Sequence, residues 1–152
     1  MNIYFDIETI PAQDPVAIEL IKADNEKQKL SVKAPSNYKD EEKIAAYIKA
    51  EVEKLDAEFD ATYRKTSFDG GLGEICCIGY AIDDNAPVSI YGASESLILL
   101  QFYQEFMAQY NPSSQTRPKF IGHNIVNFDL RFLFQRSVMK NVKPPMMIPF
   151  SA

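Results

Sequence analysis

The sequence predicts an α/β fold, in which helices flank a mixed β-sheet and a helical insertion follows the first strand. Residues 3–8 alternate apolar and polar side chains with a period of two, which indicates a strand with one buried face. Residues 39–63 repeat apolar side chains every three or four positions, as a long amphipathic helix does. The rest of the chain mixes strand-like and helix-like patterns, an order that favours a single α/β domain over residues 1–152.

The expected elements follow one another along the whole chain. After the first strand, Pro11 ends the extended run, and residues 14–66 are expected to form the helical insertion. The glycine-rich segment 69–73 fits a turn, because it matches no phosphate-binding spacing. We expect helices at 14–29, 39–63, 94–110 and 128–139, strands at 3–8, 74–82, 87–91 and 119–123, a hairpin turn at 83–85, a loop at 111–118 and an irregular apolar tail at 143–150.

Composition restricts the classes of function. The chain has 16 basic and 21 acidic residues and a net charge of −5, so it lacks the broad basic surface of an architectural nucleic-acid binder. A nuclease remains compatible with that charge, because divalent metals supply positive charge locally. Cys76 and Cys77 are adjacent and would point to opposite faces of a strand, which disfavours a disulfide framework or a thiolate metal site. Without a signal segment or a membrane-length apolar run, we expect a cytoplasmic protein with no membrane contact.

The first candidate site segment is the strand at 3–8. Asp6 and Glu8 are two residues apart, so their side chains share one face with Cα atoms about 6.6 Å apart. Carboxylates in a core strand need compensation, and a hard divalent cation such as Mg²⁺ or Mn²⁺ provides it. The alternative interpretation places both side chains at an exposed end of the sheet.

The second candidate segment is residues 122–133, where a strand meets a helix. Asp129 falls in the first helical turn, where the helix dipole favours an ionised carboxylate. Phe132 and Leu133 would anchor this helix to the sheet and turn Asp129 towards the strand end. A simpler interpretation of the polar residues is that Asn127 caps the helix.

Together these segments carry a family resemblance. Residues 5–9, Phe-Asp-Ile-Glu-Thr, resemble the first motif of DEDD-superfamily 3′–5′ exonucleases, and Asn124-x-x-x-Phe128-Asp129 resembles the second. The spacing is similar to that of stand-alone predicted exonucleases related to the proofreading domains of family B DNA polymerases. The resemblance implies a ribonuclease H-like fold and assigns no role to the insertion.

The resemblance also implies residue roles. It implies two-metal hydrolysis of the terminal phosphodiester, with Asp6, Glu8 and Asp129 as catalytic metal ligands for Mg²⁺ or Mn²⁺. The expected partner is the 3′ end of single-stranded DNA, and the choice of DNA over RNA rests on the resemblance alone. The residues implied to contact this strand are Thr9, Ile10, Asn124 and Phe128. For Arg131 and Arg136 we expect a solvated helix face rather than phosphate contacts.

The sequence departs from the family after the second motif. The family's third motif supplies a fourth carboxylate, preceded by a Tyr or a His, yet residues 130–152 contain no Asp or Glu. His123 lies inside the second motif and cannot fill that role; it fits a hydrogen-bonded histidine at a strand end. We therefore expect a C-terminally incomplete domain that is weak or inactive as a nuclease. We also expect an apolar surface near residues 146–150 that favours self-association.

Two other functions compete with this hypothesis. A non-catalytic relic or interaction domain of the same fold would explain the missing fourth carboxylate. A haloacid dehalogenase-like phosphatase is a more distant alternative, because Asp6-Ile-Glu8-Thr9 only partly resembles its nucleophile loop and the 122–129 segment has no place in that family.

Overall fold

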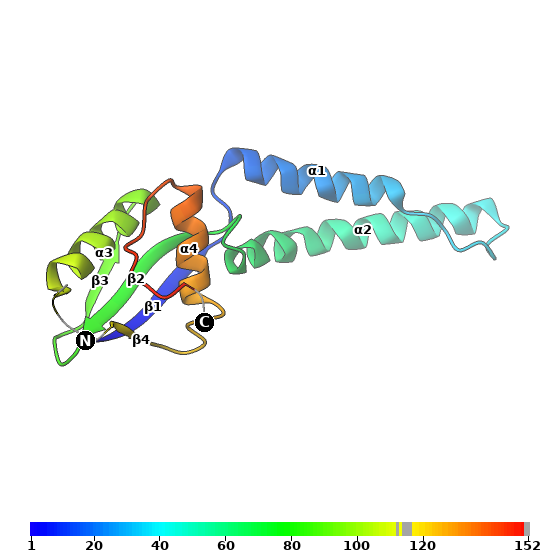
Figure 1. Ribbon diagram of the computed structural model, residues 1–152. Coiled ribbons are helices and arrows are strands. Elements are labelled where there is room, and N and C mark those ends of the chain that lie inside the picture. The colour runs from blue at the N-terminus through cyan, green and yellow to red at the C-terminus, as the bar shows by residue number, and fades with distance from the viewer. Residues whose placement is uncertain (112, 114–116, 151–152) are drawn as a thin grey trace.

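The computed structural model describes residues 1–111, 113 and 117–150, so residues 112 and 114–116 of the expected loop 111–118 lie outside the described part. The chain forms a four-stranded sheet in the order β3-β2-β1-β4 (Figure 1). The β1–β2 and β2–β3 pairs are antiparallel, whereas β1 and β4 are parallel. The elements are β1 (Asn2–Ile10), α1 (Pro15–Ser31), α2 (Glu41–Lys65), the 3₁₀ turn η1 (Thr66–Phe68), β2 (Glu74–Ile82), β3 (Val88–Tyr91), α3 (Glu95–Gln109), β4 (Lys119–Ile121) and α4 (Asp129–Met139).

The mixed sheet flanked by helices confirms the predicted α/β fold class, and its arrangement is compatible with a ribonuclease H-like fold. The expected helices and strands all form, with ends shifted by at most two residues. Neither α3 nor α4 begins with a side-chain cap. Ser94 precedes α3, but its side chain accepts no capping hydrogen bond. Phe128 rather than Asn127 precedes α4, and the Asn127 side chain instead donates to Asn124 Oδ1.

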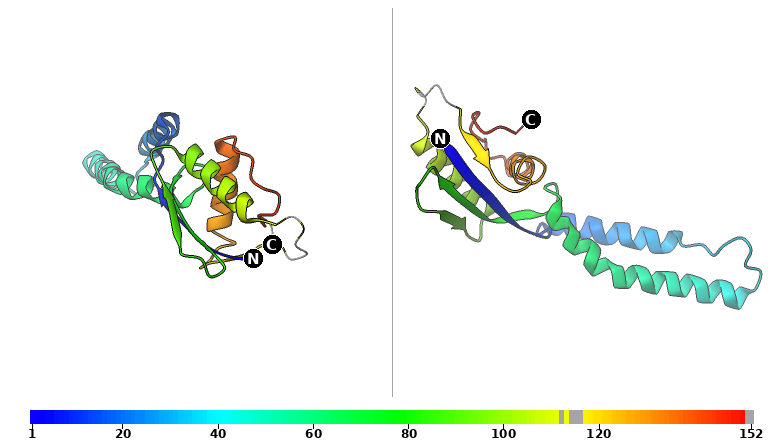
Figure 2. Two further views of the ribbon diagram at one scale, coloured as in Figure 1. Left: turned by 90° about the vertical axis from the view of Figure 1, so that its left-hand side faces the viewer. Right: turned by 90° about the horizontal axis from the view of Figure 1, so that it is seen from below.

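The two faces of the sheet differ in what covers them. Helices α3 and α4 lie on one face, as the turned view in Figure 2 shows. Ile3, Phe5 and Ile7 of β1 point into that core, where the Phe5 and Phe102 rings are 5.1 Å apart. The alternate residues of β1 are exposed. The period-two pattern in the sequence therefore reports a central strand with one buried and one open face.

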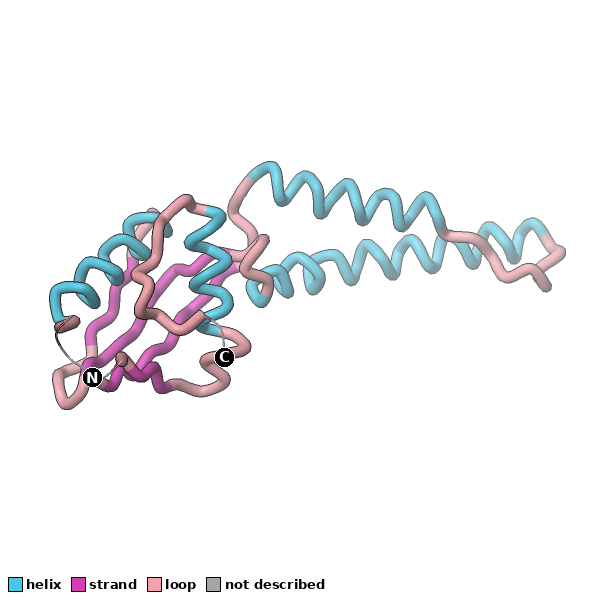
Figure 3. The backbone as a smooth tube through the Cα atoms, in the orientation of Figure 1, coloured by secondary structure: helices cyan, strands magenta, loops and turns pink. Residues whose placement is uncertain are grey.

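Helices α1 and α2 form an antiparallel arm that extends away from the sheet beyond the end of β1 (Figure 3). Neither helix contains a buried residue. The base of the arm is closed by Ala12 N–H, which donates to the Thr66 hydroxyl at 2.9 Å, and by the Tyr63 hydroxyl, which donates to Ala12 O at 2.8 Å. The insertion is thus attached through its base, and its helices pack mainly on each other.

The tail after α4 folds back onto the core. Ile148 and Val142 are buried, whereas Met146 is 93% exposed. Phe150 packs against the Phe134 ring with a centroid distance of 5.1 Å. Much of the apolar surface expected near residues 146–150 is therefore covered by the chain itself.

None of the helices in the described part of the chain is long and apolar enough to cross a membrane.

Candidate active site

Asp6 and Glu8 lie on the central strand β1, on the open face of the sheet. Both side chains are exposed, and their strand partners across β2 are Gly79 and Cys77. Exposed carboxylates remain hydrated, so the desolvation cost inferred from the sequence does not arise for this pair. The two side chains share one face, as expected, and because both are exposed their positions do not require a compensating cation.

Asp129 is the first residue of α4 and, unlike Asp6 and Glu8, it is only 3% exposed. Its Oδ1 accepts a hydrogen bond of 3.1 Å from the backbone N–H of Ile7, 122 residues away in the chain. Ile7 lies between Asp6 and Glu8 on β1. The hydrogen bond therefore joins the helix start of the second motif to the strand of the first.

The topology explains why this edge of β1 can receive Asp129. Strand β4 pairs with β1 only from Asn2 to Tyr4, which leaves the later residues of β1 without a strand on that side. Gly122 allows the chain to leave β4 close to β1, because a Cβ atom there would lie 2.5 Å from Phe5 O. Phe132 and Leu133, both fully buried, hold α4 on the core as the sequence predicted.

The environment of Asp129 shifts its acidity. Burial raises the pKa of the Asp129 carboxyl, and the nearby charge of Asp6 raises it further. Hydrogen bonds from the backbone N–H groups of Asp129 and Ile7 lower the same pKa, as does the nearby His123. The pKa of Asp129 therefore depends on groups of β1 and of the segment after β4.

Only part of this arrangement fits a metal site. Carboxylate oxygens are the ligands that Mg²⁺ and Mn²⁺ prefer, so the donor types of Asp6, Glu8 and Asp129 fit the expected ions. Among the described residues, however, no three or more His, Cys, Asp or Glu side chains are placed so that they could hold a metal ion. The structure brings Asp129 to β1 but does not form a complete ligand set.

The residues expected to contact a nucleic-acid strand lie around the same edge. Thr9 and Ile10 follow an irregularity in the β1–β2 pairing, and the Thr9 hydroxyl donates to Ser67 O at 2.8 Å. Asn124 is exposed and adopts a φ of 50°, a left-handed conformation in the turn before α4. Phe128, directly before Asp129, is half-buried and contacts the core.

A shallow cavity of about 430 Å³ lies on the open face of the sheet, next to Asp6. Asp6 and His123 line it from β1 and from the segment after β4, and Tyr4 and Ser89 line it from β1 and β3. His123 itself is exposed, two residues after the end of β4. The cavity leaves room for a ligand on the face that carries Asp6.

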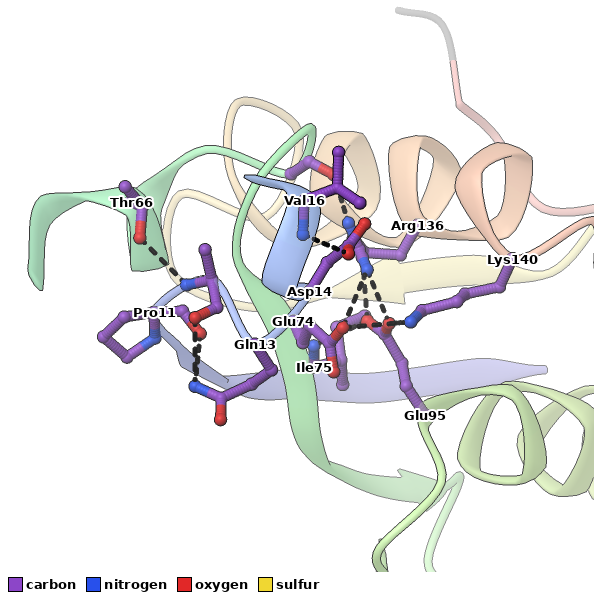
Figure 4. Close-up of polar contacts among 12 residues, drawn as sticks. Pro11, Gln13, Asp14, Val16, Thr66, Glu74, Ile75, Glu95, Arg136 and Lys140 are labelled. Carbon is purple, nitrogen blue, oxygen red and sulfur yellow. Dashed lines mark hydrogen bonds and ion pairs between the residues drawn. The ribbon is translucent and has the colours of Figure 1, made fainter. Parts of the chain in front are cut away.

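A buried ion cluster that the sequence patterns did not predict lies on the helix-covered side of the sheet (Figure 4). Arg136 is only 4% exposed, which corrects the expectation of a solvated position. Its guanidinium donates to both carboxylate oxygens of Glu95, at 2.9 and 2.8 Å, and to Gly70 O at 3.2 Å. Lys140 Nζ donates to Glu74 at 2.9 Å, so Glu74 also belongs to this cluster.

The spacing along α4 contained a signal for this cluster. Arg136 is four residues after Phe132 and three after Leu133, which places it on the same buried helix face. Glu95 is the matching acid, buried at the start of α3, and also accepts from Ile75 N–H at 2.7 Å.

Comparisons with family models, with curated proteins and with solved structures find no match for this chain.

Proposed function

We propose that this chain is a DEDD-type exonuclease domain that removes nucleotides from the 3′ end of single-stranded DNA with Mg²⁺ or Mn²⁺. The observation that supports it most is the hydrogen bond from Ile7 N–H to Asp129. Two segments that resemble exonuclease motifs, far apart in the chain, meet at one edge of the sheet. Chance motif matches would have no reason to meet.

In this proposal, Asp6 and Glu8 would hold the cations on the open face, and Asp129 would support them from the start of α4. A bound divalent cation would supply an activated water and would neutralise charge on the leaving oxygen. The chain's own contribution is to present two hydrated carboxylates and to fix the third through a backbone hydrogen bond. The nearby charge of Asp6 raises the Asp129 pKa, so these two carboxylates repel each other.

The residues proposed to contact the DNA strand lie near the end of β1 and the start of α4. Thr9 and Ile10 would contact the terminal nucleotide, and Asn124 and Phe128 would line the path of the strand. A chain with a net charge of −5 gains little from general phosphate attraction, so local contacts would have to provide affinity. We propose a reducing cytoplasm as its compartment, with which the free thiols of Cys76 and Cys77 agree.

A non-catalytic domain of the same fold is the second candidate. It is favoured by the absence of a complete metal-holding group among the described residues and by the lack of any acid in residues 130–152. Such a domain could still bind a single strand at the same edge. It would differ from the exonuclease in showing no metal-dependent hydrolysis at any enzyme concentration.

The first prediction tests hydrolysis directly. The 152-residue chain, in excess over a 5′-labelled single-stranded oligonucleotide, should shorten it slowly from the 3′ end when Mn²⁺ is present. Asp6→Ala should abolish shortening without loss of folding, because it removes a metal ligand and relieves carboxylate repulsion. Chelation of the metal should have the same effect.

Asp60→Ala is the matched control, since Asp60 is an exposed carboxylate on the arm that pairs with Arg64. This variant should retain the full rate. Shortening that survives in Asp6→Ala or in chelator would rule out the metal mechanism. Complete inactivity of the wild-type chain, and of a longer version that includes a Tyr-x-x-x-Asp segment, would favour the non-catalytic domain.

A further inference from the structure

Phe68 is an exposed aromatic side chain at the base of the arm. It ends the 3₁₀ turn between α2 and β2, and its side chain is 72% exposed. A single exposed phenylalanine needs no explanation by itself. Phe68, however, lies next to the candidate site, in contact with Phe128.

Phe68 lies beside the start of α4. Its ring centroid is 6.3 Å from that of Phe128, with 54° between the ring planes. Phe128 directly precedes Asp129, whose carboxylate is bonded to Ile7 N–H. The two rings are tilted, so the pairing leaves most of Phe68 open to solvent.

The backbone that carries Phe68 is held firmly. Ser67 O accepts the 2.8 Å hydrogen bond from the Thr9 hydroxyl, at the end of the strand that carries Asp6 and Glu8. Thr66 is buried, accepts from Ala12 N–H and donates to Tyr63 O at 2.6 Å. An aromatic side chain on a fixed support loses little conformational entropy when it binds a ligand.

The surroundings favour a nucleic-acid strand over an apolar protein segment. In an acidic chain, Lys65 lies just before the turn that carries Phe68, next to Arg64, which forms an ion pair with Asp60. Aromatic stacking on bases does not require a basic surface and accepts any base. Two residues expected to contact the strand lie nearby: Thr9 donates to Ser67 O, next to Phe68 in the chain, and the Phe128 ring is 6.3 Å from the Phe68 ring.

We propose that Phe68, together with Phe128, forms a stacking site for a nucleobase of a single strand whose 3′ end lies at Asp6, Glu8 and Asp129. The inference rests on the proposed function for the direction of the strand, but stacking itself requires no hydrolysis. It gives the inserted arm a role, because the turn at its base places Phe68 against the site.

The test uses the absence of tryptophan from this chain. Phe68→Trp introduces a single fluorescent indole, and a base stacked on it should quench the emission in a saturable way as oligothymidylate is added in chelator. Tyr91→Trp is the control, because Tyr91 is 78% exposed on β3, at the opposite edge of the sheet. Its emission should change little.

Affinity provides the second measurement. Phe68→Ala should weaken binding of a labelled single strand by about 5- to 150-fold, the range expected for loss of one base–aromatic stack. The ratio between wild type and variant should stay constant as salt rises, because stacking releases few counterions. Urea unfolding should be unchanged, since the side chain is exposed.

Several results would overturn the inference. These are equal binding by wild type and Phe68→Ala, equal quenching at both tryptophan positions, or no binding of a single strand at all. A blue shift of Phe68→Trp emission that depends on protein concentration, without oligonucleotide, would instead assign the side chain to contact with a second copy. Hydrolysis without stacking would support the exonuclease proposal and refute the role of Phe68. Stacking without hydrolysis would refute the exonuclease proposal and support a domain that only binds single strands.

Discussion

At the scale of single residues, the buried Arg136 is stabilised by the hydrogen bonds that its guanidinium donates. It donates to both oxygens of Glu95 and to Gly70 O, so it ties α4 to the start of α3 and to the turn before β2. Both side chains of the pair are nearly inaccessible to water. Removal of Arg136 would leave the buried Glu95 carboxylate with Lys140, whose Nζ lies 3.4 Å from Glu95 Oε2, as its remaining charged partner.

We expect Arg136→Met to lower the free energy of unfolding by about 3–5 kcal/mol, as measured by urea denaturation. Arg131→Met on the same helix is the control, because Arg131 is exposed, and it should change stability by no more than about 0.5 kcal/mol. Adding Glu95→Gln to Arg136→Met should recover part of the loss. Equal stability of the two arginine variants would contradict a structural role for the buried pair.

At the scale of elements, the arm behaves as an attachment and not as part of the core. Its helices bury no residue, whereas its two ends meet at the hydrogen bond between Ala12 N–H and Thr66. A short connection can therefore replace the arm without a change in the path of β1 or β2. The sheet and the core of α3 and α4 would keep all their own contacts.

Replacement of residues 15–62 by a Gly/Ser linker of about four residues should leave a cooperatively folded body. Circular dichroism should show less helix, and the unfolding midpoint in urea should stay close to that of the full chain. Ile7→Ala is the comparison, because loss of this buried side chain should cost about 2–5 kcal/mol. A linker variant that lacks a cooperative transition would show that the arm supports the sheet.

At the scale of the whole molecule, the tail closes the core on the helix side. Ile148 belongs to the same core cluster as Phe5 of β1 and Leu133 of α4. Met146, two residues earlier, is almost fully exposed. The two side chains offer a matched pair for testing whether the tail is a structural part of the domain.

Ile148→Ala should lower the free energy of unfolding by about 2–5 kcal/mol, because it leaves a cavity in the core. Met146→Ala should alter it by no more than about 0.5 kcal/mol. Urea denaturation of both variants under the same conditions checks the difference, and equal values would mean that the tail is not packed as described. Self-association stays a separate prediction, to be checked by sedimentation equilibrium of the wild-type chain.

Local patterns in the sequence determined the elements and the position of their motifs. The alternation in residues 3–8 was enough to predict β1, and the three- and four-residue spacing predicted α2, because both signals come from the geometry of one element. The same reasoning placed Asp129 at a helix start and Asp6 and Glu8 on one strand face. Those predictions required no knowledge of what each element contacts.

Only the tertiary structure decided which residues meet and which are buried. The short pairing of β4 with β1 leaves a free strand edge that receives Asp129, and the end of β1 meets the turn that carries Phe68. Arg136 changed from an expected surface residue to a buried one because Glu95 lies opposite it, 41 residues away. Contacts of this kind depend on how elements pack, and a local period reports only which face of one element is apolar.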